Sequence, residues 1–294
     1  MKDVHIHIER GPYTKEWIDT FVKQAVEMGL DEIYLLEHSH RFQEFSPMYA
    51  GIRSYSEYQN SWYEKRTGCT IKQYTDLIAE MRQYTFPIQI KWGLEVCYFP
   101  DYENLISDFI TSFPFDFATG SIHWVNGFDF DHRAEFWKDI NVELLYNQYY
   151  DSMLALVNSG LFTGLAHPDS IKCFHFFPAG DLTPKYRLLA DALNRHHMYA
   201  EQSGGLALNY GFPEMGMNLS MLDILKGKTS KFNLHPMLTG RRMWVRIFPK
   251  CDRLCTNEFT VCQMEGAVTL FHCVTAPSCC PYSMDTGGRL RKRE

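Results

Sequence analysis

The chain of 294 residues has no run of about twenty apolar residues, which is the length that a membrane-spanning helix needs. Its first residues, MKDVHIHIERG, carry a charge every few positions, where a secretory signal peptide would have an apolar stretch. We therefore expect a cytoplasmic protein without a membrane partner. The sequence gives no indication of the oligomeric state.

A stripe of lysine and arginine is also missing from the first 225 residues, which carry 17 basic against 30 acidic side chains. Because binding to nucleic acid depends on basic side chains that contact phosphates, we expect no nucleic-acid partner. An acidic protein that binds a small anion needs local positive charge, and bound metal ions could supply it.

Composition changes sharply after Leu225. Residues 226–294 carry 12 basic and 5 acidic side chains, and they hold six of the nine cysteines. Such a shift marks a boundary. We expect a folded body at residues 1–225 and a basic, cysteine-rich, disordered tail at 226–294.

Short apolar runs alternate with longer segments of helical period through the body, which is typical of βα units around a parallel sheet. No glycine-rich dinucleotide fingerprint is present, so an α/β barrel is favoured over an open doubly wound sheet, which stays an alternative. The expected strands are 3–8, 33–36, 88–94, 115–122, 162–166 and 198–200. The expected helices are 13–28, 70–84, 102–111, 142–158, 184–194 and 219–225.

Histidine and glutamate residues fall at the C-terminal ends of these strands. They are His5 and His7, Glu37 and His38, Glu95, His123, and His167. In a barrel these ends converge on one rim, where imidazoles and carboxylates can hold Zn, Mn or Fe. A lone histidine is more often a surface or hydrogen-bonded core residue, but five strand ends together indicate a metal site.

Five motifs occur in an order and spacing that resemble the polymerase and histidinol phosphatase (PHP) superfamily, in its histidinol-phosphate phosphatase branch. They are DVHIH at 3–7, LLEHSH at 35–40, GLE at 93–95, GSIH at 120–123 and GLAHPD at 164–169. The resemblance implies a distorted (β/α)7 TIM-like barrel that holds two or three divalent metal ions.

The resemblance also implies the metal ligands. One ion would be held by His5, His7 and Glu95, and Glu95 would bridge to a second ion held by His123 and His167. His38 would serve a third ion. The acid that usually completes this third set is not clear from the sequence, and Glu9 and Glu16 are the candidates.

The implied activity is hydrolysis of L-histidinol phosphate in histidine biosynthesis. Bound ions would activate water and neutralise the phosphoryl charge, while His40 or Arg41 would contact the phosphate or protonate the leaving group, unless they are only loop residues. Residues 42–67 could form a lid over the substrate. Glu201 could line the pocket, or it could cap a helix or form part of a turn. The alternatives are a phosphoesterase for another small phosphate or nucleotide, and an impaired barrel that only binds metal.

The family's late Ser-Asp-Ala-His motif, which supplies two metal ligands, is missing. Restoring one base at codon 227 lets residues 226–244 be read as KEKNIKIQLASDAHRPEDV, a strand followed by that motif. We hypothesise that the sequence from Gly227 onward results from a one-base deletion, which would remove the last strand of the barrel. The rival interpretation is a zinc site of Cys251, Cys255, Cys262 and His272, although paired CxxC motifs are absent.

Overall fold

The computed structural model describes residues 2–212, 214, 216–228, 260–264, 267–271, 282–284 and 290–292. In the tail it describes two antiparallel strand pairs, β9 with β10 and β11 with β12. Their bounds are Thr260–Met264, Ala267–Phe271, Tyr282–Met284 and Leu290–Lys292. The expectations of a disordered tail and of a cysteine zinc site fall mostly outside the described residues and stay predictions.

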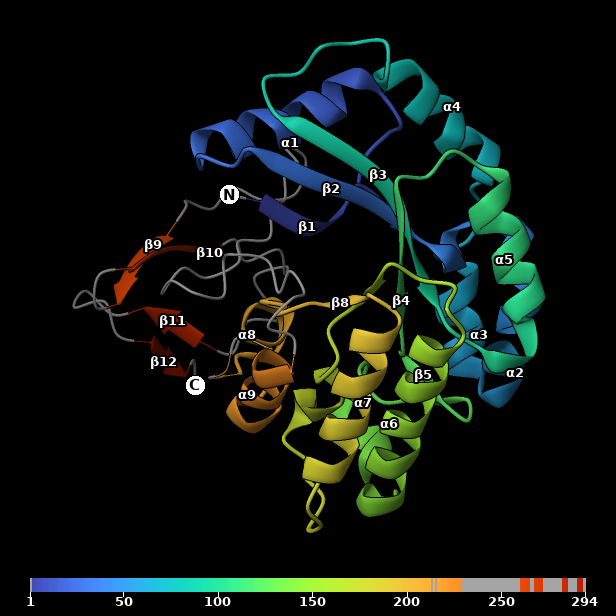
Figure 1. Cartoon of the computed structure of the whole chain (residues 1–294), viewed down its shortest axis with the longest axis vertical. Coiled ribbons are helices and arrows are strands. Elements are labelled where there is room, and N and C mark those ends of the chain that lie inside the picture. Colours follow the sequence, from blue (N-terminus) through green and yellow to red (C-terminus); the bar gives the residue numbers. More distant parts are fainter. Residues whose placement is uncertain are drawn as a thin grey trace.

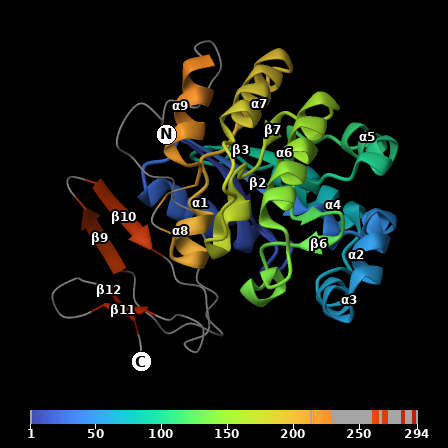
Figure 2. The same cartoon turned by 90° about the horizontal axis from the view of Figure 1, so that it is seen from below.

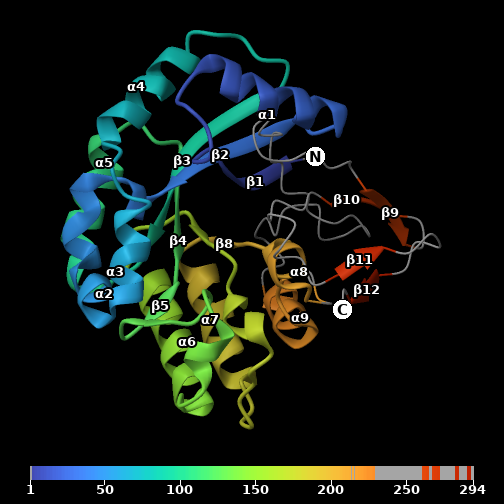
Figure 3. The ribbon, with the colours of Figure 1, turned by 180° about the vertical axis from the view of Figure 1, so that it is seen from behind.

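Six parallel strands form one curled sheet in the order β1-β2-β3-β4-β7-β8, so β1 and β8 are its two edges. Figure 1 shows the strands turning through the molecule as an incomplete barrel, and Figure 3 shows the same curl from behind. Their bounds are Lys2–His7, Glu32–His38, Gln89–Cys97, Phe117–Ser121, Gly164–Leu165 and Tyr199–Ala200. The predicted α/β barrel is confirmed in a distorted form.

Helices lie on the outer side of the sheet, and in Figure 2 the labelled strands β2, β3 and β7 lie at the centre among them. The α-helices are α1 Lys15–Glu27, α2 Ala50–Tyr55, α3 Glu57–Glu64, α4 Ile71–Met81, α5 Glu103–Ser112, α6 Val142–Asn158, α7 Thr183–Arg195, α8 Gly205–Tyr210 and α9 Leu219–Lys228. The short 3-10 helices are η1 Ser39–Arg41, η2 Gln43–Tyr49, η3 Pro100–Tyr102, η4 Ala134–Trp137 and η5 Ser170–Phe174. No helix in the described part of the chain is both long and apolar enough to span a bilayer.

Helix α1 illustrates why the local prediction works. The Thr14 side chain accepts the Trp17 amide hydrogen at its start, and Gly29 follows its end with a φ of +68°. A serine or threonine N-cap and a glycine in the left-handed region are the usual signals of the two helix ends. The helix expected from the sequence at 13–28 is therefore found, two residues shorter at the start.

The segment 42–67 is different from the expected long polar loop. It forms η2, α2 and α3, and the Ser56 side chain caps α3 by accepting the Gln59 amide hydrogen. Phe45 and Tyr49 are fully buried in the main core. None of these residues lines the pocket described below, so the structure gives no support to a lid.

A second, smaller core fills the inside of the curled sheet. It consists of Val4, Tyr34, Leu36 and Phe117, with Tyr199 packed against it. Two glycines make room for these aromatic rings. A Cβ atom on Gly93 would lie 2.5 Å from the carbonyl oxygen of Phe117, and one on Gly164 would lie 2.2 Å from the Tyr199 ring.

A β-hairpin that the sequence prediction missed follows β4. Strands β5, Trp124–Val125, and β6, Phe128–Asp129, pair antiparallel across Asn126 and Gly127, which have φ of 50° and 82°. Asn-Gly with both φ values positive is the favoured two-residue hairpin turn. The hairpin places the segment 129–132 beside the ends of the parallel strands.

Candidate metal centre

Glu95 lies at the centre of the predicted cluster, near the end of β3, and is only 1% exposed. Its Oε2 atom lies 2.9 Å from His5 Nε2, 3.0 Å from His7 Nε2 and 3.2 Å from His38 Nε2. The β2–β3 register places His38 directly beside Glu95, while His5 and His7 come from β1. Strands β1, β2 and β3 therefore bring three imidazoles to one carboxylate oxygen.

The other oxygen of Glu95 faces two further imidazoles. Oε1 lies 3.0 Å from His123 Nε2 and 3.1 Å from His167 Nε2, and these residues follow β4 and β7. The structure thus brings together the six residues that the sequence indicated as metal ligands. It divides the imidazoles into two groups, one on each oxygen of Glu95, which is the arrangement of a carboxylate that can bridge two cations.

Hydrogen bonds account for only part of this cluster. His123 Nε2 and His167 Nε2 share hydrogen bonds with Glu95 Oε1. Three imidazoles approach Glu95 Oε2, but that buried atom has no hydrogen bond of acceptable geometry among the described residues. In addition, His5 Nε2 and His7 Nε2 lie 2.9 Å apart. Ligand atoms about 2.0–2.2 Å from a shared tetrahedral zinc ion lie about 3.3 Å from one another. The donor set and its spacing therefore fit bound cations.

Burial and charge together determine the pKa values of the cluster. Burial favours the neutral form of Glu95, but the imidazoles of His38 and His5 hold its pKa well below the usual value. For His7, burial and the nearby His38 charge lower the pKa. Glu95 is therefore a fixed negative charge, and His7 is a neutral imidazole with a lone pair for a metal ion.

Three carboxylates form a second layer behind the imidazoles. Glu201 lies 2.9 Å from His5 Nδ1, and Asp131 lies 2.8 Å from His123 Nδ1. Although burial opposes the change, these neighbours and Glu95 raise the pKa of both imidazoles to about 10. A carboxylate at Nδ1 keeps the proton on that nitrogen and leaves Nε2 as the metal-facing atom.

Glu9 provides the third carboxylate. Its Oε2 lies 2.8 Å from His38 Nδ1, and Glu9, His38 and His40 form a further group whose potential ligand atoms lie within 4.8 Å of one another. Glu16 is exposed at the start of α1. Of the two acids considered for a third ion, the geometry favours Glu9.

His40 and Arg41, which were predicted to contact the phosphate, do not line the pocket. His40 is buried with its ring 4.8 Å from that of Trp62, and Arg41 Nε lies 3.6 Å from Glu37 Oε2. Their catalytic role stays a prediction. The ring of His40 lies 4.8 Å from that of His38, which does line the pocket.

Asp131 was not identified in the sequence, and Glu201 was considered only as one of two alternatives. The signal for Asp131 was the Asn126-Gly127 turn followed by FDFDH at 128–132, since a hairpin beside the fourth strand returns its acidic end to the rim. For Glu201 the signal was its position directly after β8.

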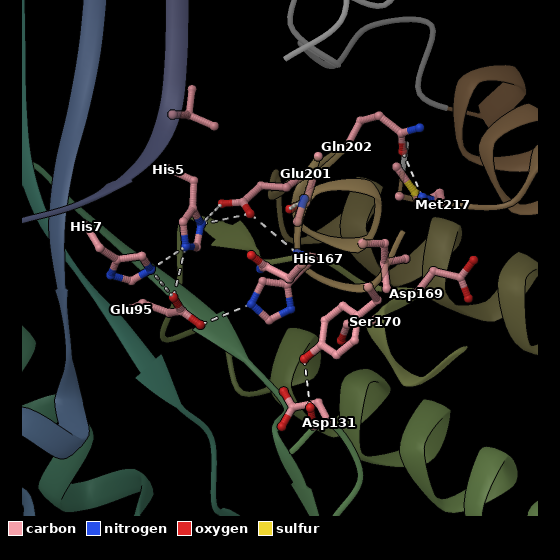
Figure 4. Close-up of a pocket in the computed structure, with 18 of the residues that line it drawn as sticks. His5, His7, Glu95, Asp131, His167, Asp169, Ser170, Glu201, Gln202 and Met217 are labelled. Carbon is pink, nitrogen blue, oxygen red and sulfur yellow. Dashed lines mark hydrogen bonds and ion pairs between the residues drawn. The ribbon is translucent and has the colours of Figure 1, made fainter. Parts of the chain in front are cut away.

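The cluster forms one wall of a pocket, which Figure 4 shows with Glu201 lying between His5 and His167. Asp169, Ser170 and the segment 201–206 form much of the remaining wall. Among the described residues that line the pocket there is no lysine or arginine. Apart from its histidines, the described lining therefore has no side chain that could neutralise a bound anion.

Two known proteins and one protein family resemble this chain. A protein of Deinococcus radiodurans described as "Probable histidinol-phosphatase" is 26% identical over 215 residues, which cover 71% of this chain and 72% of that protein. The crystal structure of histidinol phosphate phosphatase from Lactococcus lactis, complexed with zinc, L-histidinol and phosphate, is 19% identical and matches with a TM-score of 0.49, covering 78% of this chain and 93% of that chain. The family described as PHP domain matches residues 3–209. Because this match spans well over half of the chain, the protein belongs to the PHP domain family.

Proposed function

We propose that this protein is a metal-dependent phosphatase that hydrolyses a small phosphate monoester, and that its substrate is L-histidinol phosphate. The observation that carries the proposal is the approach of five imidazole Nε2 atoms to within 3.2 Å of the two oxygens of Glu95. In this proposal His5, His7 and Glu95 hold one divalent ion, and Glu95, His123 and His167 hold a second. Glu9 and His38 serve a third, and the ions are Zn, Mn or Fe.

Phosphate monoesters hydrolyse very slowly without a catalyst, so charge neutralisation at the phosphoryl group is essential. Bound divalent ions supply a nucleophile near neutral pH and neutralise the phosphoryl oxygens. The pocket suits this use of metal ions, because its described lining has no lysine or arginine and its histidines are the proposed metal ligands.

The residues of the chain hold and orient the reactants. Glu95 is buried, and the imidazoles of His38 and His5 keep it anionic by holding its pKa low. The Ser203 hydroxyl accepts the Gly205 amide hydrogen and still has its own hydrogen to donate to a phosphoryl oxygen. Fixed charges and donors of this kind need no reorganisation during the reaction.

The choice of L-histidinol phosphate rests on the relative from Deinococcus radiodurans, which is described as a probable histidinol-phosphatase and matches over 71% of this chain. A role in histidine biosynthesis follows from that choice.

The test is phosphate release by the full-length protein from a panel of L-histidinol phosphate, other small phosphate monoesters and nucleotides, with Zn, Mn or Fe added. We expect the highest kcat/KM for L-histidinol phosphate and loss of turnover in the Glu95→Ala variant. Equal or higher kcat/KM for another phosphate would leave the phosphatase assignment intact and contradict the substrate.

One observation favours a second candidate, an impaired barrel that binds metal without turnover. The sequence contains no Ser-Asp-Ala-His motif, which in the family provides two ligands. Elemental analysis that finds bound metal in a protein without phosphatase activity on the whole panel would support this candidate over the first.

A further inference from the structure

We propose that Glu201 is a positioning residue, which fixes the His5 and His167 imidazoles for metal binding and joins the two open edges of the curled sheet. This inference rests on the proposed function, since it concerns the same metal centre. Glu201 follows β8, is 3% exposed, and its amide hydrogen is donated to the Leu165 carbonyl at 3.0 Å. Its backbone is therefore anchored on β7.

The first contact of the carboxylate fixes His5. Both oxygens of Glu201 lie 2.9 Å from His5 Nδ1. The other ring nitrogen, Nε2, lies 2.9 Å from both Glu95 Oε2 and His7 Nε2. When a cation replaces the Nε2 proton, Glu201 still holds the proton on Nδ1, so the Nε2 lone pair is directed at the point where the ligand atoms converge. Without Glu201, either tautomer and a range of ring rotations become accessible to His5.

The second contact acts on His167. The His167 amide hydrogen points to Glu201 Oε2, with the two heavy atoms 3.4 Å apart. His167 has a φ of 29°, a value that non-glycine residues adopt only with strain. An anionic acceptor for its amide hydrogen favours this conformation, which directs the side chain toward Glu95 Oε1. One carboxylate thus acts on one imidazole of each group around Glu95.

The contact between Glu201 and His5 also connects the two edges of the sheet. Strands β1 and β8 are the two edges of the sheet, and no backbone pairing between them occurs in the described residues. His5 and Glu201 are 196 residues apart in the chain, and Figure 4 shows Glu201 reaching across the pocket to His5. The side-chain contact therefore joins the edges where the strands do not pair.

Asp131 also contacts an imidazole Nδ1 atom, but its loss should affect less of the metal centre than the loss of Glu201. Asp131 contacts His123 Nδ1 in a similar way, but the two residues are only eight apart and lie in one hairpin region. Loss of Asp131 would disturb one imidazole locally. Loss of Glu201 would disturb two imidazoles and the contact between the edge strands.

The experiment compares the full-length wild type with Glu201→Ala, Glu201→Gln, Glu95→Ala and a control, Asp116→Asn. Asp116 is a suitable control because it accepts the Trp92 amide hydrogen at 2.8 Å and an Arg82 hydrogen at 2.9 Å, at the opposite end of the strands. Zinc affinity is measured by chelator competition after metal removal. The tautomer of His5 is measured by proton–nitrogen NMR of the zinc-loaded samples and of metal-free samples held above pH 10, where the imidazole is neutral.

We expect Glu201→Ala to weaken zinc affinity about 10–100-fold and to shift His5 away from its single tautomer. Glu201→Gln retains an acceptor for the His5 Nδ1 hydrogen, so it should keep the tautomer and lose less affinity. If the alanine variant does not fold, the glutamine variant decides, and it must still bind zinc more weakly than Asp116→Asn does. Zinc affinity and tautomers equal to those of the control in both Glu201 variants would overturn the inference. If Glu95→Ala also binds zinc normally, the proposed function fails as well; if only Glu95→Ala loses zinc, the inference alone fails.

Discussion

At the residue scale, the cluster depends on a single buried carboxylate facing five imidazoles. A carboxylate that is fully buried is costly unless it is paired, and Glu95 has no hydrogen bond of good geometry on Oε2 among the described residues. The cations that its neighbours can hold would compensate that charge. Replacing Glu95 should therefore affect metal binding more than it affects folding.

We predict that Glu95→Gln retains less metal than the wild type, because a neutral amide cannot bridge two cations as a carboxylate does. Elemental analysis of purified protein should show loss of at least one metal ion per chain, with an unchanged far-ultraviolet circular dichroism spectrum. Glu103→Gln is the control, since Glu103 accepts the Tyr98 hydroxyl hydrogen at 2.6 Å and does not line the pocket. Equal metal content in both variants would contradict the central role of Glu95.

The pH dependence of stability should reveal a second buried acid. Burial and the Glu9 charge raise the pKa of Glu37 to about 8, above an ordinary value of 4.5. The folded protein therefore binds this proton more tightly than the unfolded chain, and the contribution of Glu37 to stability falls as the pH rises from about 4.5 to about 8. Tyr13 donates a hydrogen bond to Glu37 at 3.0 Å, which a glutamine could still accept.

We predict that Glu37→Gln removes this loss in the metal-free protein. The free energy of unfolding is measured with urea at pH 5.5 and pH 8.5. Between these pH values, the variant's stability relative to the wild type should rise by on the order of 1 kcal/mol or more. A difference between variant and wild type that is the same at both pH values would show that Glu37 does not hold its proton in the folded state.

Seven histidine and glutamate side chains could be placed at one rim from the sequence because strand ends in a parallel barrel meet there. The choice of six of them as metal ligands, without Glu37, came from the resemblance to the PHP superfamily. Asp131 could not be placed, since its position depends on a hairpin that projects from the sheet. The contact of Glu201 with His5 could not be predicted from the sequence either, because it depends on the curvature of the sheet.

At the element scale, the fit between neighbouring strands sets strict limits on side-chain size. Gly93 and Phe117 are register partners on β3 and β4, and the Phe117 ring belongs to the inner core. A methyl group at position 93 would lie 2.5 Å from the Phe117 carbonyl oxygen. Both strands carry residues that lead to the metal centre, so a shift here would be transmitted to the cluster.

We predict that Gly93→Ala destabilises the protein by about 1–3 kcal/mol, because backbone atoms must move to accommodate the methyl group. Gly51→Ala is the matched control, since Gly51 is exposed in α2 and an added Cβ there has nothing within 4 Å. That variant should be neutral or more stable by up to about 1 kcal/mol. Urea midpoints measure both, and equal midpoints would argue against the close approach at Gly93.

The segment 42–67 shows where prediction of elements fails. Its helices are short, and none has the length of a typical amphipathic helix. Two local signals were nevertheless available: the capping serine at 56, and the buried residues Phe45, Met48, Tyr49 and Ile52 at the i, i+3, i+4, i+7 spacing of a helix. The long helix α6, in contrast, has the bounds expected from its sequence, because seventeen residues of regular period outweigh local exceptions.

At the scale of the whole molecule, the metal centre links strands that are far apart in the chain. Its imidazoles come from β1 and β2 and from the residues after β4 and β7, and the sheet edges β1 and β8 are not joined by backbone pairing in the described residues. Ions that bind the folded protein and not the unfolded chain stabilise it by mass action.

We predict that a chelator lowers the unfolding temperature of the full-length protein by several degrees, and that added zinc restores it. A free metal concentration about 100-fold above the dissociation constant stabilises the folded protein by about 2–3 kcal/mol. The His5→Ala variant should respond less to both treatments. Identical thermal unfolding with and without chelator, in protein shown to have contained metal, would contradict a structural contribution from the ions.

The tail is tested at the level of the gene. If a one-base deletion at codon 227 created residues 227–294, the genomic DNA must give Ser-Asp-Ala-His in a neighbouring frame, and a chain with the frame restored should bind more metal than the present one. Codons that cannot give that motif in any frame would refute the deletion. In that case the metal sites of this chain must be completed without the family's late ligands.

The sequence by itself determined the order of the six parallel strands and of the longer helices, favoured a barrel, and placed seven histidine and glutamate side chains at the strand ends, because these follow from short-range periodicity and from the shared direction of parallel strands. Only the tertiary structure decided which oxygen of Glu95 each imidazole faces, that His40 and Arg41 do not line the pocket, and that Glu201 reaches His5. Those relations depend on the curvature of the sheet and on the glycines that allow its inner core to pack. Both are set by contacts between residues that are distant in the chain.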